Sequence, residues 1–511
     1  MPGAWTVARV RTAEKILIAR VGEGVLMRRA AFGLATRTAV ALAERTGGVS
    51  GRHVALLVGA GNNGGDALWA GAFLRRRGVA VTAVLLSPER AHPQGLTALR
   101  RTGGQIADQL PDRADLMLDG IVGLSGRGGL RPAAAELVQG AQVPIIAVDS
   151  PSGVDPDTGT ADGLAVTATE TVTFGARKPV HLLAPWRCGP VHLVDIGLFG
   201  ELGEPDLRVL TAAEIGAQWP VPGPASDKYS QGVLGIAAGS ADYPGAAVLC
   251  AGAAVLATSG MVRFAGTAAD AVRARWPEVV ATGSVSDAGQ VQGWAVGPGL
   301  GTGAAGRQVL TQVLAAGVPV VADADAITLL ARHPNLADSR DPDTPLVLTP
   351  HDREFERLTG KAPGTDRVAA VRDAARRFDA VLVLKGNTTI IAAPDGRVLV
   401  NPARSSWPAT AGSGDVLTGV LGALLAAGLE PTTAAAAAVH AQEFAAAIAA
   451  GGGKSSPIAG VGKLSPIAGV GKLSPIARGG THSGAPAPAS AIQVALSDAI
   501  RALRSVAGMR G

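Results

Sequence analysis

The sequence predicts an α/β protein with two three-layer domains, each built on a mainly parallel sheet with helices on both faces. Two observations lead to this fold class. Short strands that are apolar at nearly every position alternate with helical segments along most of the 511 residues, and such strands are typical of sheets buried on both faces. The alternation also stops once, at residues 219–227, where three prolines and a glycine predict a linker.

The first domain is expected at residues 1–218. It opens with a helical segment over about 12–44, where apolar residues repeat at intervals of three and four. A strand, Val54–Val58, then leads into a glycine-rich turn and a helix. The strands expected after that helix are Val79–Leu86, Asp115–Gly123 and Val143–Gly153. Polar residues follow several of these strands, at the edge of a parallel sheet where ligands bind.

The second domain is expected at residues 228–511 and shows the same alternation. Its predicted strands are Val233–Ser240, Gly293–Gly301, Val318–Ala326, Pro345–His351 and Ala380–Ala393, and a helix over about 489–506 ends the domain. Near its end, three consecutive units of nine residues, KSSPIAGVG, KLSPIAGVG and KLSPIARGG, fill residues 454–480. Each unit has proline, glycine and few large apolar groups, which predicts a flexible loop rather than a packed repeat.

The charge and the cysteines argue against several classes of function. The formal net charge is +5 with a pI near 9.5, but the basic residues are scattered, so we predict no nucleic-acid partner. The two cysteines, Cys188 and Cys250, are far apart in the sequence and form no metal-ligand spacing. We see neither the pattern of a signal peptide nor a long charge-free apolar run, so we expect a cytoplasmic protein without a membrane partner.

The segment GAGNNGGD, Gly59–Asp66, lies between a predicted strand and a predicted helix. This arrangement points backbone N–H groups and a helix N-terminus at an anion. The glycine spacing matches neither a dinucleotide fingerprint nor a Walker loop. Asn62, Asn63 and Asp66 add amide donors and oxygen ligands that suit a ribose, a phosphate or a monovalent cation. A tight turn with asparagines in left-handed geometry explains the same residues equally well.

Three polar residues, Asp119, Asp149 and Ser152, stand at the ends of predicted strands in the same domain. A single aspartate at a strand end is often a cap, but three such residues beside one glycine loop predict a shared site. Glycines at positions 123, 126, 128 and 129 would allow the backbone to approach a bound phosphate closely.

In the second domain, glycine-rich turns again stand beside charged residues. The segment KGNTT, Lys385–Thr389, is either a grip for nucleotide phosphate or a turn between two strands, and Gly297–Gly301 would admit close backbone approach. His351, at a strand end, is either structural or a ligand. Asp415 opens a long apolar helix, where it is explained by a helix cap or by catalysis beside an anion site. The glycines before it favour the anion site, and both roles can share the position.

The segments NNGGD, LDGIVGLSGRGGLRP and VDSPSGVD resemble the signature segments of the NAD(P)H-hydrate epimerase family. The segments YPGAAVL, GPGLG, LTPHDREF, LKGNTT and TAGSGDVLTG resemble its usual fusion partner, ADP-dependent NAD(P)H-hydrate dehydratase. The resemblance covers nearly the whole chain apart from the nine-residue units. It implies a Rossmann-like N-terminal domain, an isomerase that interconverts R- and S-NAD(P)HX. It also implies a ribokinase-like C-terminal domain, a lyase that dehydrates S-NAD(P)HX to NAD(P)H with ADP, giving AMP and phosphate.

The resemblance also implies which residues form the two sites. The epimerase substrate is expected at Asn62, Asn63, Gly64, Gly65, Asp66, Gly123, Leu124, Ser125, Gly126, Arg127, Gly128, Gly129 and Asp149, and a potassium ion at Asn63, Asp119 and Ser152. The dehydratase is expected to bind the hydrate through Ala246, Gly301, His351 and Asp415, and ADP through Lys385, Gly386, Asn387, Thr388, Thr389 and Gly414, with Mg²⁺. Asp149 and Asp415 are the expected catalytic residues. The chain departs from the family pattern at Ala60 and Ala67, where small residues replace small ones.

Two other functions share some of these features. A ribokinase-type kinase of a small molecule, such as a vitamin precursor, would use the same glycine turn and aspartate, but such kinases lack the N-terminal domain. A non-catalytic NAD(P)-binding sensor would keep the fold without turnover, but the joint presence of Asp119, Asp149, Lys385 and Asp415 disfavours it. The expected partners are therefore NAD(P)HX and ADP. A homo-oligomer is compatible with the resemblance, since related assemblies are often oligomeric.

Overall fold

The computed structural model describes residues 3–22, 24–124, 126, 128–258, 260–403, 405–451 and 484–508. The chain forms two compact units, one of Gly3–Leu207 and one that begins at Arg208. The predicted flexible loop at 454–480 lies outside the described residues. In the described part of the chain, no helix has both the length and the apolar character needed to span a membrane.

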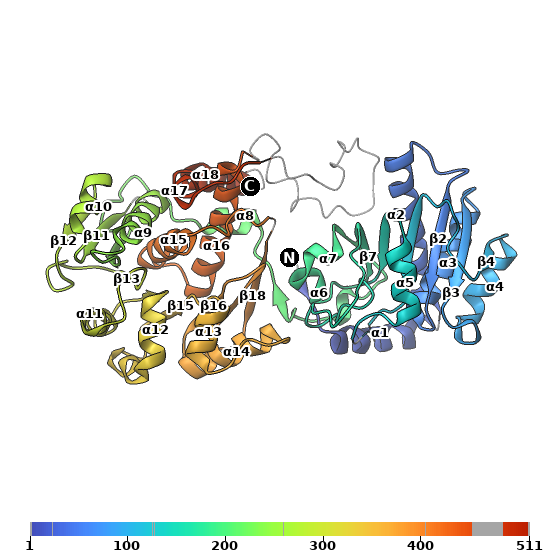
Figure 1. Ribbon diagram of the computed structural model, residues 1–511, viewed down its shortest axis with the longest axis horizontal. Helices are drawn as coiled ribbons and strands as arrows, with labels where there is room; N and C mark the ends of the chain where they lie inside the picture. The colour runs from blue at the N-terminus through green and yellow to red at the C-terminus, as the bar shows by residue number, and fades with distance from the viewer. Residues whose placement is uncertain are drawn as a thin grey trace. The chain divides into compact units, whose positions relative to one another are not determined.

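A parallel sheet forms the middle layer of the N-terminal unit (Figure 1). Its strand order is β4-β3-β2-β5-β6-β7-β8, and every neighbouring pair is parallel. Alternate residues of β2 face opposite sides: Leu56 and Val58 belong to one cluster of buried side chains, Ala55 and Leu57 to another. The strands are β2 (His53–Val58), β3 (Ala80–Leu85), β4 (Gln105–Ala107), β5 (Leu116–Gly120), β6 (Ile145–Val148), β7 (Glu170–Phe174) and β8 (Val191–Val194), with a short β1 (Gly3–Ala4) near the N-terminus.

Helices cover both faces of this sheet, which confirms the three-layer arrangement. The helices are α1 (Val7–Val21), α2 (Val25–Thr46), α3 (Asn62–Arg75), α4 (Pro93–Arg101), α5 (Pro132–Gly140), α6 (Val180–Leu183) and α7 (Pro185–Cys188), with 3₁₀ turns η1 (Pro88–Arg90) and η2 (Phe199–Glu201). Side chains of α1, α2 and α3 pack in the first cluster and those of α5 in the second. The segment predicted as one helix at 12–44 is two helices, because Gly22 and Gly24 adopt φ values of 89° and 78° that favour glycine and end the helical path.

The C-terminal unit is built on a longer sheet, of order β18-β17-β16-β15-β14-β13-β10-β11-β12, which β9 extends through pairing of Arg208 with Leu399. The strands are β9 (Leu207–Arg208), β10 (Val233–Ala237), β11 (Met261–Ala265), β12 (Val280–Thr282), β13 (Gly293–Val296), β14 (Val320–Ala322), β15 (Leu346–Leu348), β16 (Val381–Leu384), β17 (Thr388–Ala392) and β18 (Val398–Pro402). Strand β17 runs antiparallel to both neighbours. The prediction of one strand at 380–393 is therefore wrong, because β16 and β17 form a hairpin whose turn holds Lys385, Gly386 and Asn387.

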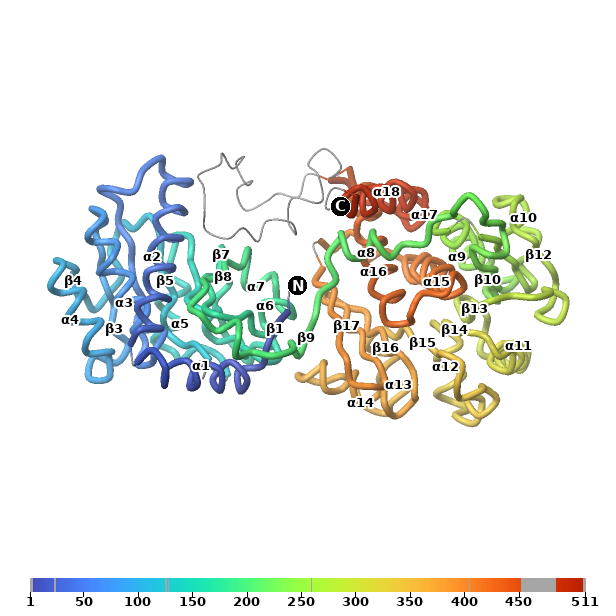
Figure 2. Tube along the Cα trace, turned by 180° about the vertical axis from the view of Figure 1, so that it is seen from behind, coloured from blue at the N-terminus to red at the C-terminus, as the bar shows by residue number. Residues whose placement is uncertain are grey.

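Helices cover both faces of this second sheet as well. They are α8 (Ala212–Gln218), α9 (Pro244–Ala257), α10 (Ala269–Arg275), α11 (Ala304–Leu314), α12 (Asp325–Arg332), α13 (Asp352–Thr359), α14 (Arg367–Phe378), α15 (Ser413–Ala426), α16 (Pro431–Ala449), α17 (Ala489–Val494) and α18 (Leu496–Gly508), with a 3₁₀ turn η3 (Pro334–Ser339). Figures 1 and 2 show α9, α15 and α16 on one side of the sheet and α12, α13 and α14 on the other.

Helix α8 packs with the C-terminal unit, although the predicted boundary placed it in the first domain. Ile215 and Trp219 belong to the core of the C-terminal unit, and Trp219 Nε1 donates a hydrogen bond to the Ala257 carbonyl at 3.0 Å. Trp219 is therefore core rather than linker. The compact units meet at Leu207 and Arg208, before the predicted linker at 219–227. A functional boundary at residue 218 stays a prediction.

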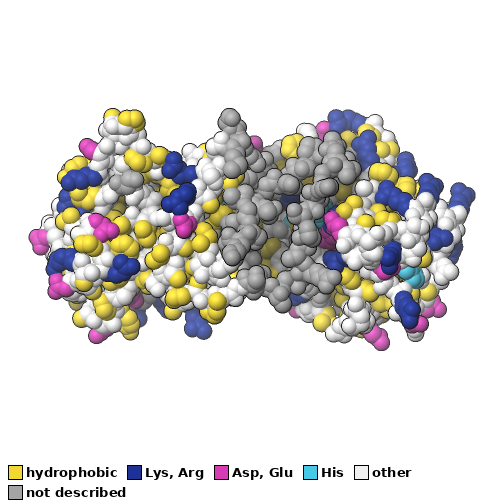
Figure 3. All heavy atoms as spheres, turned by 90° about the horizontal axis from the view of Figure 1, so that it is seen from above, with side chains coloured by type: hydrophobic (Ala, Val, Ile, Leu, Met, Phe, Trp, Pro, Cys, Tyr) yellow, Lys and Arg dark blue, Asp and Glu magenta, His cyan; other side chains and the backbone are white. Residues whose placement is uncertain are grey.

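The surface charges and the cysteines of the described residues do not point to a particular binding site. On the face seen in Figure 3, lysine and arginine side chains lie among hydrophobic and acidic ones. Cys188 and Cys250 are buried free thiols. Among the described residues, no group of three or more histidine, cysteine, aspartate or glutamate side chains is placed to hold a metal ion. A metal site built on this chain therefore has to use other oxygen donors, such as amides and hydroxyls.

Candidate functional sites

The N-terminal site lies where the chain changes direction across its sheet. From β2 the chain builds β3 and β4 on one side, and it then returns to build β5 to β8 on the other. The loops that follow β2 and β5 therefore diverge and leave a crevice, which is where ligands bind in sheets of this kind. A cavity of about 1160 Å³ occupies this place.

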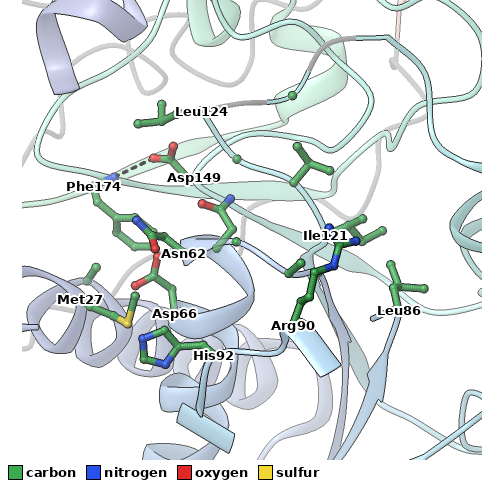
Figure 4. Close-up of a pocket in the computed structure, with 18 of the residues that line it drawn as sticks. Met27, Asn62, Asp66, Leu86, Arg90, His92, Ile121, Leu124, Asp149 and Phe174 are labelled. Carbon is green, nitrogen blue, oxygen red and sulfur yellow. Dashed lines mark hydrogen bonds between the residues drawn. The ribbon is translucent and has the colours of Figure 1, made fainter. Parts of the chain in front are cut away.

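Most residues predicted for the epimerase site line this cavity: Asn62, Asn63, Asp66, Gly123, Leu124, Gly126, Gly128, Gly129 and Asp149. Figure 4 shows Asn62, Asp66 and Asp149 gathered toward one end, and Leu86, Arg90 and Ile121 toward the other. Ser125 and Arg127 lie outside the described residues. Gly64 and Gly65 do not line the cavity but are buried in the first turn of α3.

The glycines of the first loop are needed for contacts within the protein itself. A Cβ on Gly59 would lie 1.8 Å from the Ile121 carbonyl oxygen, and one on Gly64 would lie 2.2 Å from the Gly59 carbonyl oxygen. Backbone atoms cannot move away cheaply, so neither position accepts a side chain. The loops after β2 and β5 thus touch at the floor of the cavity. The segment is a tight turn that also lines the cavity, but Asn62 and Asn63 begin α3 and do not have the left-handed geometry that was expected for the turn. Ligand binding by this loop stays a prediction.

Asp119 and Ser152 form a buried polar pair below the cavity. The Ser152 hydroxyl donates to Asp119 Oδ1 at 2.6 Å, and the Ser152 backbone N–H donates to Oδ2 at 2.8 Å. Burial raises the pKa of Asp119 to about 6, although these bonds from Ser152 oppose the shift. A buried carboxyl of this kind is one that a bound cation would favour in its charged form.

Asn63 connects the end of β6 to the loop after β5. Its Nδ2 donates to the Val148 carbonyl at 2.5 Å, which leaves the amide oxygen to face Gly123, where a Cβ would lie 2.1 Å from it. Asn63, Asp119 and Ser152 therefore supply oxygen donors only. Such donors suit a hard cation, so the residues present fit the predicted potassium ion.

Asp149 is held by a network that the sequence did not reveal. It follows β6 with a φ of 68°, a left-handed conformation that Asp adopts more readily than most residues. Its Oδ1 accepts hydrogen bonds from Lys178 Nζ, and from the Thr173 hydroxyl at 3.0 Å. Lys178 is 1% exposed and makes an ion pair with Asp149. A charged carboxylate is thus fixed at the end of the cavity.

His181 fixes the backbone of the same residue. Its Nδ1 accepts from the Lys178 N–H at 3.0 Å, so its Nε2 carries the proton that is donated to the Asp149 carbonyl at 2.8 Å. Burial and then the nearby Lys178 ammonium lower the pKa of His181 to about 3. His181 is therefore a neutral support for Asp149 rather than a proton carrier.

The C-terminal site is organised around Asp323, which follows β14 and is 2% exposed. Its Oδ1 accepts from Lys385 Nζ at 2.8 Å, and its Oδ2 accepts from the Thr418 hydroxyl of α15 at 3.0 Å. Lys385 Nζ also lies 3.8 Å from Glu354 Oε2 of α13. Asp323 thereby joins the ends of β14 and β16 to the first turns of α15.

Asp415 lies in the first turn of α15, whose N-cap is Gly412 with a φ of 83°. Within the described residues, its carboxylate makes no hydrogen bond to the helix end, so it does not act as a cap. Burial and then the negative charge of Asp323 raise the pKa of Asp415 to about 7, and Lys385 opposes this. A carboxyl that is half ionised near neutral pH suits a general base.

Of the predicted hydrate-binding and nucleotide-binding residues, Gly414, Lys385 and Asp415 lie at this centre, while Ala246 and Gly301 contact Gly299 and Asp325 instead. A Cβ on Gly414 would lie 3.4 Å from Asp323 Oδ2 and 3.7 Å from Lys385 Nζ, so Gly414 leaves space above that ion pair. A Cβ on Gly297 would lie 2.0 Å from the Asp323 carbonyl, and one on Gly299 would lie 3.1 Å from the Ala246 Cβ. The Gly301 N–H donates to Asp325 Oδ2 at 2.9 Å.

Three predicted positions have structural roles. His351 caps α13, because its Nδ1 accepts from the Arg353 and Glu354 N–H groups at 3.1 and 3.4 Å, while Glu354 Oε2 accepts from the His351 N–H at 2.9 Å. Thr388 and Thr389 are buried residues of β17. Of the two readings of Lys385–Thr389, the hairpin turn is therefore present, and it places the Lys385 ammonium on Asp323. Binding roles for these residues stay predictions.

Comparison with known proteins identifies the family. A family profile described as NAD(P)H-hydrate dehydratase matches residues 234–454, and one described as YjeF-related protein N-terminus matches residues 23–180. The bifunctional NAD(P)H-hydrate repair enzyme Nnr of Mycobacterium tuberculosis (strain CDC 1551 / Oshkosh) is 55% identical over 435 residues, which cover 84% of this chain and 91% of that protein. The chain belongs to the family of bifunctional NAD(P)H-hydrate repair enzymes.

Another member of this repair enzyme family gives the same picture, and a solved dehydratase structure is similar to part of the chain. The enzyme of Mycobacterium leprae (strain TN) is 56% identical over 434 residues, covering 84% of this chain and 90% of that protein. A crystal structure of an ADP/ATP-dependent NAD(P)H-hydrate dehydratase from Bacillus subtilis, co-crystallized with ATP/Mg²⁺, is 30% identical with a TM-score of 0.43, covering 47% of this chain and 88% of that one. The prediction of a two-domain repair enzyme is confirmed.

In this repair enzyme, sequence reasoning missed the partners of the two aspartates that are predicted to be catalytic. Asp323 ends a predicted strand, so the rule that selected Asp119 and Asp149 could have found it. Lys178 stands in the unremarkable segment FGARKPVHL. Its burial against Asp149 depends on the fold alone, so no local signal marks it.

Proposed function

We propose that the N-terminal cavity epimerises R- and S-NAD(P)HX and that the Asp323 centre dehydrates S-NAD(P)HX with ADP, in the cytoplasm. The observation that carries this proposal is that each unit holds one of the two aspartates expected to be catalytic in a polar centre: Asp149 beside Lys178, and Asp415 beside Asp323. Among the described residues, the partners of each aspartate named above come from its own unit. The assignment of one reaction to each unit would be the same in a homo-oligomer.

In the dehydratase, Asp415 takes the proton of the C6 hydroxyl. The freed oxygen attacks the β-phosphorus of ADP, the bond to the bridging oxygen breaks, and AMP leaves. Phosphate then departs from C6 while a proton is lost from C5, which restores the dihydronicotinamide double bond. Lys385 and the N–H groups at the start of α15 offset the charge on the phosphates. Gly414 leaves room for those phosphates beside Lys385.

The chain's residues fit Mg²⁺ mainly as an ion bound to the nucleotide. Asp323 already accepts from Lys385 and Thr418, and Glu354 accepts from the His351 N–H. Mg²⁺ usually keeps several waters and binds substrate phosphates, so the phosphates of ADP would supply its main ligands and Asp415 would stay available as the base. When bound, the ion lowers the cost of negative charge on the phosphates.

In the epimerase, Asp149 contacts the nicotinamide ring and handles protons while the C6 hydroxyl changes faces. Glycines 123, 126, 128 and 129 and the start of α3 bind the diphosphate, since both line the cavity and a helix N-terminus favours an anion. Asn63, Asp119 and Ser152 would hold potassium at the cavity floor, where its charge favours bound phosphate.

A mixture of the two hydrate epimers tests the proposal with the purified chain. With ADP, we expect all of the mixture to become NAD(P)H, in a fast phase from the S epimer and a slower phase from the R epimer. Without ADP we expect no NAD(P)H. If NAD(P)H forms from the R epimer only at the rate of spontaneous epimerisation, the epimerase assignment of the N-terminal unit is contradicted. If NAD(P)H forms without ADP, the dehydratase assignment of the C-terminal unit is contradicted.

The dehydratase is expected to lose activity as the pH falls through about 7, because Asp415 must be ionised to take a proton and its pKa is raised to about 7. Asp323→Asn removes the negative charge that helps to raise this pKa, so the acid limb of the pH profile, where activity falls, should move to lower pH. The pH profile of ADP-dependent NADH recovery from the S epimer measures both effects. An unchanged limb in the variant would show that Asp415 is not the titrating base.

A further inference from the structure

Acidic side chains from three different elements face one end of the N-terminal cavity. Glu14 of α1, Asp66 of α3 and Asp149 after β6 all line it. Figure 4 shows Asp66 and Asp149 at this same end, with Asn62 and Phe174 beside them. Lys178 is the cation paired with one member of this set, Asp149. The carboxyls therefore have unequal surroundings although they share one cavity.

Asp149 is the carboxyl that is stabilised in its charged form. Lys178 donates to its Oδ1, and the Thr173 hydroxyl donates to the same atom. The Phe174 N–H adds a third donor at 3.4 Å. Charge-assisted hydrogen bonds of this kind stabilise a carboxylate strongly. Asp149 can thus accept a proton but starts without one.

Asp66 has the opposite surroundings. It is 6% exposed, and its buried Oδ1 accepts no hydrogen bond from the described residues. Burial raises the pKa of Asp66 well above its ordinary value, the charges of Asp149 and Glu14 add to the shift, and Lys178 opposes it. The neutral acid is therefore favoured.

The other ionisable groups at this end do not compensate Asp66. Burial also raises the pKa of Glu14, and Arg11 and Lys178 oppose that shift. The ring of His92 lies against Gly65 next to Asp66, and its Nδ1 accepts from the Gly95 N–H at 3.1 Å. No hydrogen bond from His92 to Asp66 Oδ1 is present among the described residues. Burial lowers the pKa of His92, so it is the neutral form that is favoured there.

We propose that Asp66 is the catalytic acid of the epimerase, that Asp149 is the base that works with it, and that Lys178 is a positioning residue that keeps Asp149 charged. This inference rests on the proposed epimerase function of the cavity. When the surroundings of two carboxyls keep one protonated and the other charged, the two can work as an acid–base pair, a pattern found in many enzymes.

The chemistry follows from the structure of the hydrate, in which C6 carries the hydroxyl and is bonded to the ring nitrogen N1. Asp66 gives its proton to the hydroxyl, the C6–O bond breaks, and water leaves. The electron pair of N1 forms a double bond to C6, so the ring becomes a cation that the Asp149 carboxylate stabilises. Water then adds to C6 from the opposite face and gives a proton to Asp149. Exchange with solvent returns the proton to Asp66, and no oxidant is needed.

The full-length chain provides its own control, because the dehydratase reports on folding of the other unit. With the epimer mixture and ADP, Asp66→Asn should keep the fast phase from the S epimer and lose about 10²-fold or more in the slow phase from the R epimer. Glu136→Gln, which changes an exposed carboxyl on α5, should keep both phases. A slow phase in Asp66→Asn equal to that of the wild type would overturn the proposal.

Two further measurements separate an acid from a merely structural residue. The wild-type epimerisation rate should fall as the pH rises through the pKa of Asp66, whereas Lys178→Met should lower the rate because Asp149 loses its ammonium partner. The infrared difference spectrum of wild type minus Asp66→Asn, recorded at neutral pH without substrate, should contain the band of a protonated carboxylic acid. Absence of that band would overturn the assignment. If the wild-type chain converts the R epimer no faster than spontaneous epimerisation does, the epimerase function itself is refuted.

Discussion

An Asp415→Ala chain is expected to lose ADP-dependent dehydration and to retain epimerisation. The loss should be about 10²- to 10⁴-fold, which is the usual contribution of a positioned general base. The free energy of unfolding of the Asp415→Ala chain should not be reduced at alkaline pH by this site. Folding raises the pKa of Asp415 to about 7, so the folded state binds more protons at this position and loses stability as the pH rises from the ordinary value toward 7. Removal of the carboxyl removes that loss.

Asp270→Ala is the matched control for this prediction, because Asp270 is also an acid in the first turn of a helix of the same unit but is exposed and paired with Arg273. The control should dehydrate the S epimer at the wild-type rate. Epimer interconversion, followed by chromatography without ADP, should proceed equally in both variants. Normal NADH recovery by the Asp415→Ala chain would remove Asp415 from the mechanism.

The second large effect is expected in the N-terminal unit, where Asp149→Asn should abolish epimerisation and loosen the fold. Asparagine tolerates the left-handed φ of 68° at this position, so the loss comes from chemistry and charge. The variant leaves the Lys178 ammonium buried without its partner, and breaking a buried ion pair costs about 3–5 kcal/mol. Hydrogen exchange of the amides in β6 and β7 should accelerate, while β13 and β14 keep their protection.

The double variant Asp149→Asn, Lys178→Met separates stability from catalysis. Replacing both charges with neutral groups removes the unpaired ammonium, so protection of β6 and β7 should return at least in part. Epimerisation should remain absent. Recovered epimerisation in the double variant would show that the aspartate acts only through the fold.

Much of this account could be predicted from the sequence because strand ends in a parallel sheet meet at one edge. Asp119, Asp149 and Ser152 were selected by that rule. The structure pairs Asp119 at the end of β5 with Ser152, and it places Asp149 after the neighbouring strand β6. The same rule could have selected Asp323, but its contacts with Lys385 and Thr418 from distant segments could not be predicted.

Other parts could not be predicted because they depend on packing between segments far apart in the chain. The glycines at 59 and 64 are consistent with a ligand loop, yet their Cβ positions are filled by the protein's own backbone. Lys178 is buried only because the segment after β7 folds over Asp149. The division at Leu207 likewise follows from the packing of α8 and Trp219, which local composition does not show.

The central claim is that one chain carries two independent catalytic centres that act in sequence. The most direct test is to mix the Asp415→Ala chain with the Asp149→Asn chain, and to follow NADH recovery from the pure R epimer in the presence of ADP. Each variant alone should convert the R epimer no faster than spontaneous epimerisation allows, whereas the mixture should convert it at a rate that grows with the amount of the Asp415→Ala chain. A mixture no faster than the Asp149→Asn chain alone would contradict the claim.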